Sequence, residues 1–372
     1  MSADYDSLRV TPARPYVPTM CKTPLHPFLR AIPKCEHHVH LEGSLEPSLL
    51  FTLAKANDIP LPSDDDAFSS EAALRARYKD FTSLDDFLHY YYIGMSVLIH
   101  SSDFEALAWS YFVKARDHGV HHTEVFFDPQ AHISRGISYH SIVSGFTKAK
   151  SRAKAELGLT SELVCCFLRH LPVPEALATF EDPQVQESFA NGTVIGIGLD
   201  SSELNFPPHL FDDIYRKAGA LGLRRTAHAG EEGPAEYIAG SIDLLGVERI
   251  DHGIKLHLDE QLMKRVAQKQ LMLTVCPMSN VMLRCVDHVG EVPIRKFLDA
   301  GVRFSINSDD PAYFGGYILD NYCAVHDAFN LSIQEWAGIS RAGIEGSWCS
   351  TERKREMLTA LDDLVKEWEQ KM

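Results

Sequence analysis

Residues 34–43 contain the histidines His38 and His40, which are separated by a single residue. Successive side chains of a strand point to opposite faces, so in a strand both imidazoles share one face while His37 and Val39 point the other way. Neutral histidine is a common transition-metal ligand, and two on one face make half of a metal site. A His-x-His pair also arises by chance in a chain with 18 histidines. The rest of the sequence must therefore decide between these readings.

Other polar residues end short apolar runs further along the chain. His228 ends the run 224–228, His252 ends the run 249–252, and Asp309 ends the run 302–309. Three histidines and one aspartate (His38, His40, His228 and Asp309) offer the nitrogen and oxygen ligands that suit a single Zn²⁺ ion. Zinc lowers the pKa of bound water from about 15.7 to about 7, so hydrolysis is the natural reaction class.

Glu231 follows His228 by three residues, in a turn where Gly230 and Gly233 allow a sharp exit. A carboxyl shielded from water has a raised pKa and can donate a proton to a substrate nitrogen. The alternative is an exposed loop carboxylate, which is how we interpret Glu232. His252 can hydrogen-bond to the attacking water or accept its proton.

Asp310 follows Asp309 directly and can accept a hydrogen bond from a heterocycle N–H. The sequence Asp-Asp-Pro at 309–311 is also a good turn, so each aspartate alone is weak evidence.

Eight short apolar runs, separated by stretches long enough for a helix, can position these residues. Strands that alternate with helices pair in parallel, and eight of them predict an α/β protein with a closed (β/α)8 TIM barrel. Its catalytic residues are expected at the C-terminal ends of the strands. The predicted strands are 33–40, 123–128, 163–170, 194–200, 224–228, 249–252, 272–276 and 302–309.

Between the first two predicted strands lies an insertion. It begins with a helix that has Pro47 in its first turn, continues through a polar loop at 63–77, and ends in an aromatic helical segment at 78–100. That segment is typical of core, and its position also allows it to cover a pocket. Proline-rich residues 1–27 are predicted to form an irregular leader, and residues 28–372 a single barrel domain.

Composition limits the partners. The formal net charge of −15 argues against nucleic acid, because phosphate contacts require clustered lysine and arginine. No run approaches the roughly 18 apolar residues of a membrane span. The first residues carry Asp4 and Asp6 and show no signal peptide, so we expect a cytoplasmic protein, with the nucleus as an alternative. The oligomeric state is open. The sequence contains neither a phosphate-binding Gly-rich loop ending in Gly-Lys-Ser/Thr nor a Gly-x-Ser-x-Gly motif.

Taken together, the motifs resemble the adenosine/AMP deaminase branch of the metal-dependent hydrolases. They occur in that family's order and are the segments 38–43 (HVHLEG), 228–231 (HAGE), 251–253 (DHG), 276–280 (CPMSN) and 308–311 (SDDP). The resemblance implies a zinc barrel with a helical insertion after strand one. It also implies hydrolysis of the 6-amino group of a purine.

The same resemblance implies individual roles. His38, His40, His228 and Asp309 would bind one Zn²⁺ per chain, since strand four ends in Gly198-Leu199-Asp200 where binuclear relatives carry a lysine. As catalytic residues, Glu231 would protonate N1 and His252 would orient or deprotonate the water. Asp310 would hold N7.

Within this family, adenosine enzymes usually carry Asp at the position of Glu42 and a small Ala-Gly pair near Asp200. Larger groups here would fill the volume that ribose needs. We therefore expect Glu42 and Asp200 to contact the substrate and exclude the sugar. Segments 126–130 and 206–209 are most similar to the fungal and bacterial adenine deaminases, which implies deamination of adenine in purine salvage. The alternatives are adenosine or an N6-substituted purine as substrate, or a catalytically dead zinc-bound scaffold or signalling barrel.

Overall fold

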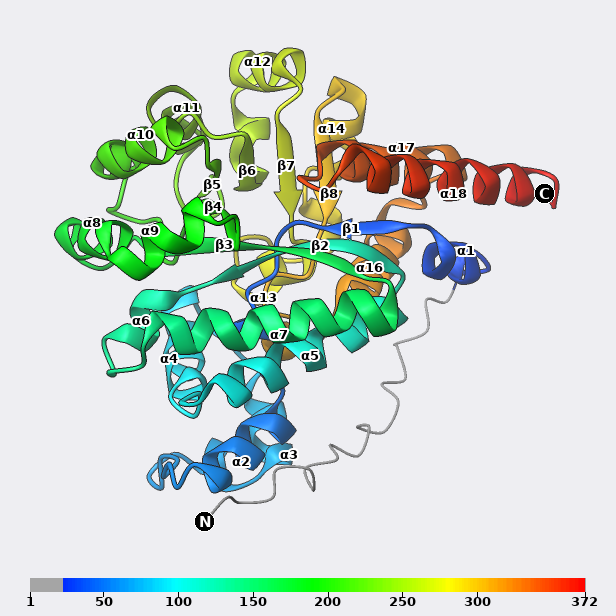
Figure 1. The fold of residues 1–372 in the computed structure, drawn as a ribbon. Helices are drawn as coiled ribbons and strands as arrows, with labels where there is room; N and C mark the ends of the chain where they lie inside the picture. Colours follow the sequence, from blue (N-terminus) through cyan, green and yellow to red (C-terminus); the bar gives the residue numbers. More distant parts are fainter. Residues whose placement is uncertain (1–22, 372) are drawn as a thin grey trace.

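The computed structural model describes residues 23–371. Its eight strands pair in parallel and in chain order, as expected for a (β/α)8 barrel (Figure 1). They are β1 (Lys34–Glu36), β2 (Val120–Phe127), β3 (Thr160–Leu168), β4 (Val194–Asp200), β5 (Arg224–Ala229), β6 (Arg249–His252), β7 (Met272–Val275) and β8 (Arg303–Ile306). The predicted fold class is confirmed.

Strand β1 is shorter than the predicted 33–40. After Glu36 the chain leaves the regular ladder, because the amide of His37 donates to the side chain of Asn307 (N to Oδ1, 2.8 Å). Pairing resumes at isolated bridges, where Val39 pairs with Asp309 and His40 with Phe126. The backbone carbonyl of Asp309 accepts a hydrogen bond from the amide of His40 (3.0 Å), and the backbone amide of Asp309 donates one to the carbonyl of His38 (3.1 Å). These bonds join β8 to β1 and close the barrel.

Helices alternate with the strands and surround them (Figure 1). They are α1 (His26–Ala31), α2 (Pro47–Ala56), α3 (Glu71–Arg77), α4 (Leu84–Met95), α5 (Ser101–Asp117), α6 (Pro129–Ile133), α7 (Tyr139–Leu157), α8 (Val173–Glu181), α9 (Pro183–Ala190), α10 (Asp212–Ala220), α11 (Ala235–Gly240), α12 (Glu260–Lys269), α13 (Pro277–Met282), α14 (Ile294–Ala300), α15 (Pro311–Phe314), α16 (Ile318–Phe329), α17 (Ile333–Gly346) and α18 (Thr351–Glu369).

The insertion after β1 contains more helix than predicted. Figure 1 shows α2, α3 and α4 gathered at one side of the barrel. Residues 63–77 were expected to be a polar loop, but they form the short 3₁₀-helix η3 (Asp66–Ser69) and α3. The reason is local: the Ser70 hydroxyl caps the amide of Ala73 (3.2 Å), and the side chains of Phe68 and Leu74 are buried. The expected helix with Pro47 at its start is present as α2.

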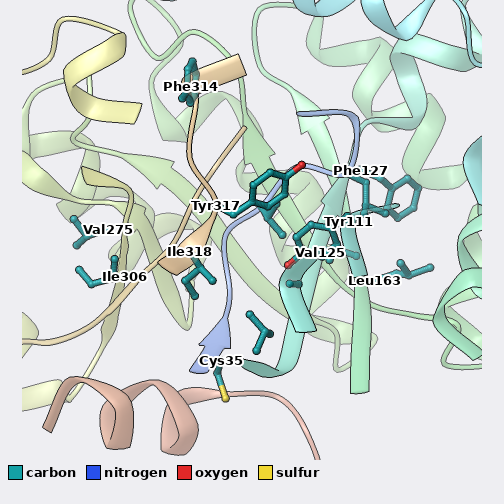
Figure 2. Close-up of a cluster of buried hydrophobic side chains, with 14 of the residues drawn as sticks. Cys35, Tyr111, Val125, Phe127, Leu163, Val275, Ile306, Phe314, Tyr317 and Ile318 are labelled. Atoms are coloured by element: carbon teal, nitrogen blue, oxygen red, sulfur yellow. The ribbon is translucent and has the colours of Figure 1, made fainter. Parts of the chain in front are cut away.

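One contiguous hydrophobic core joins the strands to the helices around them. Figure 2 shows part of it, with Val125 and Leu163 from neighbouring strands, Ile306 from β8 and Ile318 from α16. The predicted leader, residues 1–27, lies almost entirely outside the described residues. Within residues 23–371, no helix is long and apolar enough to cross a membrane.

Candidate active site

The predicted ligands meet at the C-terminal end of the barrel, around the carboxylate of Asp309. One of its oxygens, Oδ1, lies 3.1 Å from Nε2 of His38 and 3.4 Å from Nε2 of His40, while Oδ2 lies 3.8 Å from Nε2 of His252. Ligand atoms of His38, His228, His252 and Asp309 all lie within 4.8 Å of one another. His40 falls in an overlapping group with Asp309 and Asp310. The structure thus brings the four predicted ligands together and adds His252 to them.

Asp251 at the end of β6 supports two of these imidazoles from behind. Its Oδ2 lies 3.5 Å from Nδ1 of His228, and its Oδ1 accepts hydrogen bonds from Thr226 (2.7 Å) and Thr274 (2.9 Å). The Thr274 hydroxyl also contacts Nδ1 of His38 (2.9 Å). Burial raises the pKa of Asp251, but bonding to His228 and the charges of His38 and His228 outweigh it and lower that pKa. With their Nδ1 atoms held in this way, both rings turn Nε2 towards the cluster.

Two residues of the cluster have strained backbones. His252 (φ 60°) and Asp309 (φ 65°) adopt left-handed conformations that side chains with a Cβ rarely take. Such strain costs about 1–3 kcal/mol per residue and persists where the surrounding structure enforces it, most often at functional sites. His252 ends β6 and Asp309 follows β8 by three residues, so both strained positions lie where the chain leaves a barrel strand.

The donor set fits a divalent transition metal. It combines imidazole nitrogens with a carboxylate, all buried, which is the combination that zinc prefers. Burial lowers the pKa of His40 to about 3 and, together with the like charges of His38 and His228, also lowers the pKa of His252. Neutral imidazoles are the form that binds a metal.

Glu231 lies beside the cluster, in the turn that follows β5, and is 4% exposed. Its Oε2 is 3.3 Å from Nε2 of His252, and its Oε1 accepts a hydrogen bond from the amide of Asn280 (2.9 Å). Burial, followed by the charges of Asp309 and Glu203, raises the pKa of Glu231 well above its usual value. A carboxyl kept neutral in this way can donate a proton. Glu232 instead lines a separate surface groove.

A pocket adjoins the cluster. One wall is apolar and is formed by side chains of α4. The aromatic segment 78–100 therefore covers a pocket, which its position in the sequence had allowed. The other walls carry the cluster residues and carboxylates. The lining residues are His40, Leu84, Phe87, Leu88, Tyr91, Tyr92, Asp128, Leu168, Asp200, Ser201, His228, Glu231, His252, Leu283, Asp309 and Asp310.

Asp128 and Asp200 face each other in this pocket. The Tyr91 hydroxyl donates to Oδ2 of Asp128 (3.2 Å), and Oδ2 of Asp200 lies 3.5 Å from Nδ1 of His40. Burial and the charge of Asp128 raise the pKa of Asp200 well above its usual value. Asp128 and Asp200 are therefore placed to form hydrogen bonds with a group that binds in the pocket.

Glu42 does not reach the place that the sequence suggested. It lies outside the described pocket lining, where its Oε1 accepts hydrogen bonds from Nε2 of His132 (2.9 Å) and the amide of Asp128 (3.2 Å). We expected it to touch the substrate; the structure places it beside the pocket lining instead, and its contact with the substrate stays a prediction. The reason is that residues 42–44 form a 3₁₀-turn that carries the Glu42 side chain behind Asp128.

Asp310, in contrast, does line the pocket. Its approach depends on Gly43, because a Cβ at that position would lie 1.9 Å from Oδ1 of Asp310.

Sequence reasoning assigned no role to Asp128, Tyr91, Asn280 or Asp251. Asp128 and Asp251 lie at or just after the C-terminal end of a strand, as the predicted ligands do, so the same positional signal could have found them. Tyr91 and Asn280 lie within helices α4 and α13, where only the fold shows that they reach the site.

Comparison with known proteins agrees with this geometry. A family model described as Adenosine deaminase matches residues 33–364. The adenine deaminase of Schizosaccharomyces pombe is 56% identical over 349 residues (94% of this chain and 95% of that protein). The adenine deaminase of Aspergillus oryzae is 58% identical over 346 residues (93% and 98%).

Two solved structures share the fold. The adenine deaminase from Arthrobacter aurescens is 41% identical with a TM-score of 0.85, covering 90% of this chain and 100% of that one. An amidohydrolase from Burkhoderia ambifaria, described with bound Zn, is 27% identical with a TM-score of 0.81 (92% and 94%). The chain therefore belongs to the adenosine deaminase family.

Proposed function

We propose that this protein hydrolyses adenine to hypoxanthine and ammonia, as a step of purine salvage. The observation that carries the proposal is the pocket itself, in which a buried acid, Glu231, and a His/Asp cluster face two further carboxylates, Asp128 and Asp200. Relatives more than 50% identical over most of the chain bear the name adenine deaminase, and so does the similar structure from Arthrobacter aurescens.

We assign one Zn²⁺ per chain to His38, His40, His228 and Asp309. Nε2 of His40 lies nearer to the Asp309 carboxylate (3.4 Å) than Nε2 of His252 does (3.8 Å). His252 also contacts Glu231 and the side-chain amide of Asn280 (3.3 Å), which ties it to the acid. The zinc-bound relative from Burkhoderia ambifaria supports the choice of metal. When bound, zinc would lower the pKa of water to about 7 and so supply the nucleophile.

The chain's own residues then move the protons. Glu231, neutral because it is buried, gives its proton to N1 of the purine as water adds to C6. His252, 3.3 Å from Glu231, accepts the proton of the water and returns it to the departing amino group. Burial and the charge of Asp309 raise the pKa of Asp310, so its neutral carboxyl can donate a hydrogen bond to N7. As ammonia leaves, the remaining hydroxyl proton on C6 passes to Glu231, which forms the 6-oxo group and restores the acid. Adenine and water thus give hypoxanthine and ammonia, and Glu231 and His252 return to their starting forms.

The free base is favoured over the nucleoside by the charge and volume of the pocket wall. Free adenine carries an N–H on its five-membered ring, which the carboxylates of Asp128 and Asp200 can accept. In adenosine, N9 carries the sugar instead, and these side chains occupy the space it needs. Overpacking a filled site costs about 1–3 kcal/mol. Glu42 contributes indirectly, by fixing the backbone of Asp128.

The test compares adenine, adenosine and N6-methyladenine as substrates of the zinc-loaded protein, followed by ultraviolet absorbance. We expect kcat/KM for adenine to exceed that for adenosine by about tenfold or more, which corresponds to about 1.4 kcal/mol. Faster turnover of adenosine or of the N6-substituted base would overturn the substrate assignment. If none of the three is turned over by protein that holds zinc, the chain is a scaffold and not a catalyst.

A further inference from the structure

Glu203 is a buried carboxylate outside the pocket lining, three residues beyond the end of β4, and is only 1% exposed. It accepts three backbone hydrogen bonds from the turn that carries Glu231. The amide of Glu231 donates to Oε1 (2.9 Å), and those of Gly230 and Gly233 donate to Oε2 (2.9 and 3.1 Å). A single side chain therefore holds the backbone on both sides of the acid.

The segment that carries Glu203 is itself fixed to the barrel. The amide of Phe206 donates to the carbonyl of Glu203 (3.1 Å), and the carbonyl of Phe206 accepts from Nε of Arg169 (3.0 Å). Arg169 is fully buried, and its Nη1 also donates to the carbonyl of His228 (2.8 Å). The guanidinium of Arg169 thus hydrogen-bonds both to the segment that carries Glu203 and to the backbone of the predicted metal ligand His228.

The position requires a carboxylate. Three N–H donors converge on its two oxygens, whereas an amide side chain offers one acceptor oxygen and would turn an NH₂ group towards an N–H. Hydrogen bonds to a charged acceptor are also about twice as strong as neutral ones. The close approach depends on Gly233, since a Cβ there would lie 2.4 Å from Oε2 of Glu203.

We infer that Glu203 is a positioning residue for the deamination reaction, which holds the Glu231 turn so that the carboxyl of Glu231 meets the ring nitrogen of the substrate. This inference rests on the proposed role of Glu231 as the proton donor. Glu203 reaches neither the pocket nor the metal ligands' side chains, so its removal should affect proton donation and leave metal binding unchanged. A misplacement of about 1 Å at a reacting group can cost about 100-fold in rate.

A double-mutant cycle tests this with Glu203→Gln, Glu231→Gln and the double variant, each with its zinc content and melting temperature measured. We expect Glu203→Gln to lower kcat about 10- to 100-fold, with KM changed less than threefold and zinc retained. In the Glu231→Gln background the same change should cost less than twofold, because the group it positions is already lost. Glu203→Asp keeps the charge and should restore part of the rate.

Glu232→Gln is the matched control, because it removes a carboxylate from the same turn but outside the pocket, and it should keep the wild-type rate. Effects of Glu203→Gln and Glu231→Gln that multiply, an unchanged kcat, or a loss of rate that follows loss of zinc would overturn the inference. So would failure of both Glu203 variants to fold, which would make Glu203 a folding residue. Rates are measured with whichever 6-aminopurine the wild type turns over fastest, so a wrong substrate assignment would not be mistaken for a wrong role of Glu203.

Discussion

Replacing Glu231 with glutamine isolates the contribution of one proton. The two side chains have nearly the same shape, and the glutamine carbonyl can still accept the hydrogen bond that Asn280 donates to Oε1 (2.9 Å). The amide would face Nε2 of His252, which lies 3.3 Å from the present Oε2. The backbone contacts to Glu203 do not involve the Glu231 side chain and remain. Only the ability to donate a proton to the substrate is lost.

A positioned general acid contributes about 10²- to 10⁴-fold to the rate, or about 2.7–5.4 kcal/mol. We expect a loss in the upper part of this range, because Glu231 is 4% exposed and water has little access to replace it as a donor. The assay is kcat for adenine under saturating conditions, together with zinc content and melting temperature. A fall of less than threefold, with zinc retained, would refute the role of Glu231 as the acid.

The pH dependence provides an independent check on the same residue. Burial and neighbouring charges raise the pKa of Glu231, so the neutral, proton-donating form persists to a higher pH than in an exposed glutamate. Activity that needs this form falls as the pH rises through the raised pKa. The rate of the Glu231→Gln variant should lack that alkaline decline, whereas Glu232→Gln should retain it.

Three further predictions concern the metal, the sugar and stability. Chelation should abolish activity and lower the melting temperature, and added Zn²⁺ should restore both, as measured on one sample before and after addition. Asp200→Ala opens the space beside Asp128, so the ratio of kcat/KM for adenosine to that for adenine should rise about tenfold; an unchanged ratio would show that Asp200 does not exclude the sugar. The third prediction concerns the buried side chain of His132. Its Nδ1 accepts a hydrogen bond from Nη2 of Arg135 (2.7 Å), and its Nε2 donates one to Glu42. Burial lowers the pKa of His132 to about 3. In the unfolded chain His132 binds a proton at about pH 6.5, whereas in the folded chain it stays neutral to a much lower pH. The free energy of unfolding therefore decreases as the pH falls below 6.5. Relative to His132→Gln, the wild type should lose about 2.3 kcal/mol of unfolding free energy between pH 6.5 and 4.5, measured by denaturant titration; an unchanged difference would contradict a neutral His132.

Much of the barrel could be predicted from the sequence, because buried parallel strands are short apolar runs that can be recognised locally. The runs predicted at 194–200 and 249–252 match β4 and β6 in both bounds. The first strand was predicted too long because its end depends on Asn307, far along the chain, which captures the amide of His37. The helices η3 and α3 were missed because their large buried anchors, Phe68 in η3 and Leu74 in α3, are spaced too sparsely among polar residues to show a periodic pattern.

The predicted side chains converge at one end of the barrel for a similar reason. Residues at the C-terminal ends of parallel strands must share a rim, so position along a run was enough to find His228, His252 and Asp309. The roles of residues that act on the site through another residue could not be predicted in this way. Glu42 begins a turn whose direction the sequence does not show, and Glu203 accepts hydrogen bonds from backbone amides, which carry no residue-specific signal.

The hydrogen bonds that close the barrel have a consequence for how the protein is made. His38 and His40 belong to the first strand region and Asp309 to the last, and the nearby contact between His37 and Asn307 spans 270 residues of sequence. A chain still emerging from the ribosome therefore carries two histidines that have no aspartate to complete their site. Only after β8 has been synthesised can the ring of strands shut, and the metal centre is assembled in that same late event.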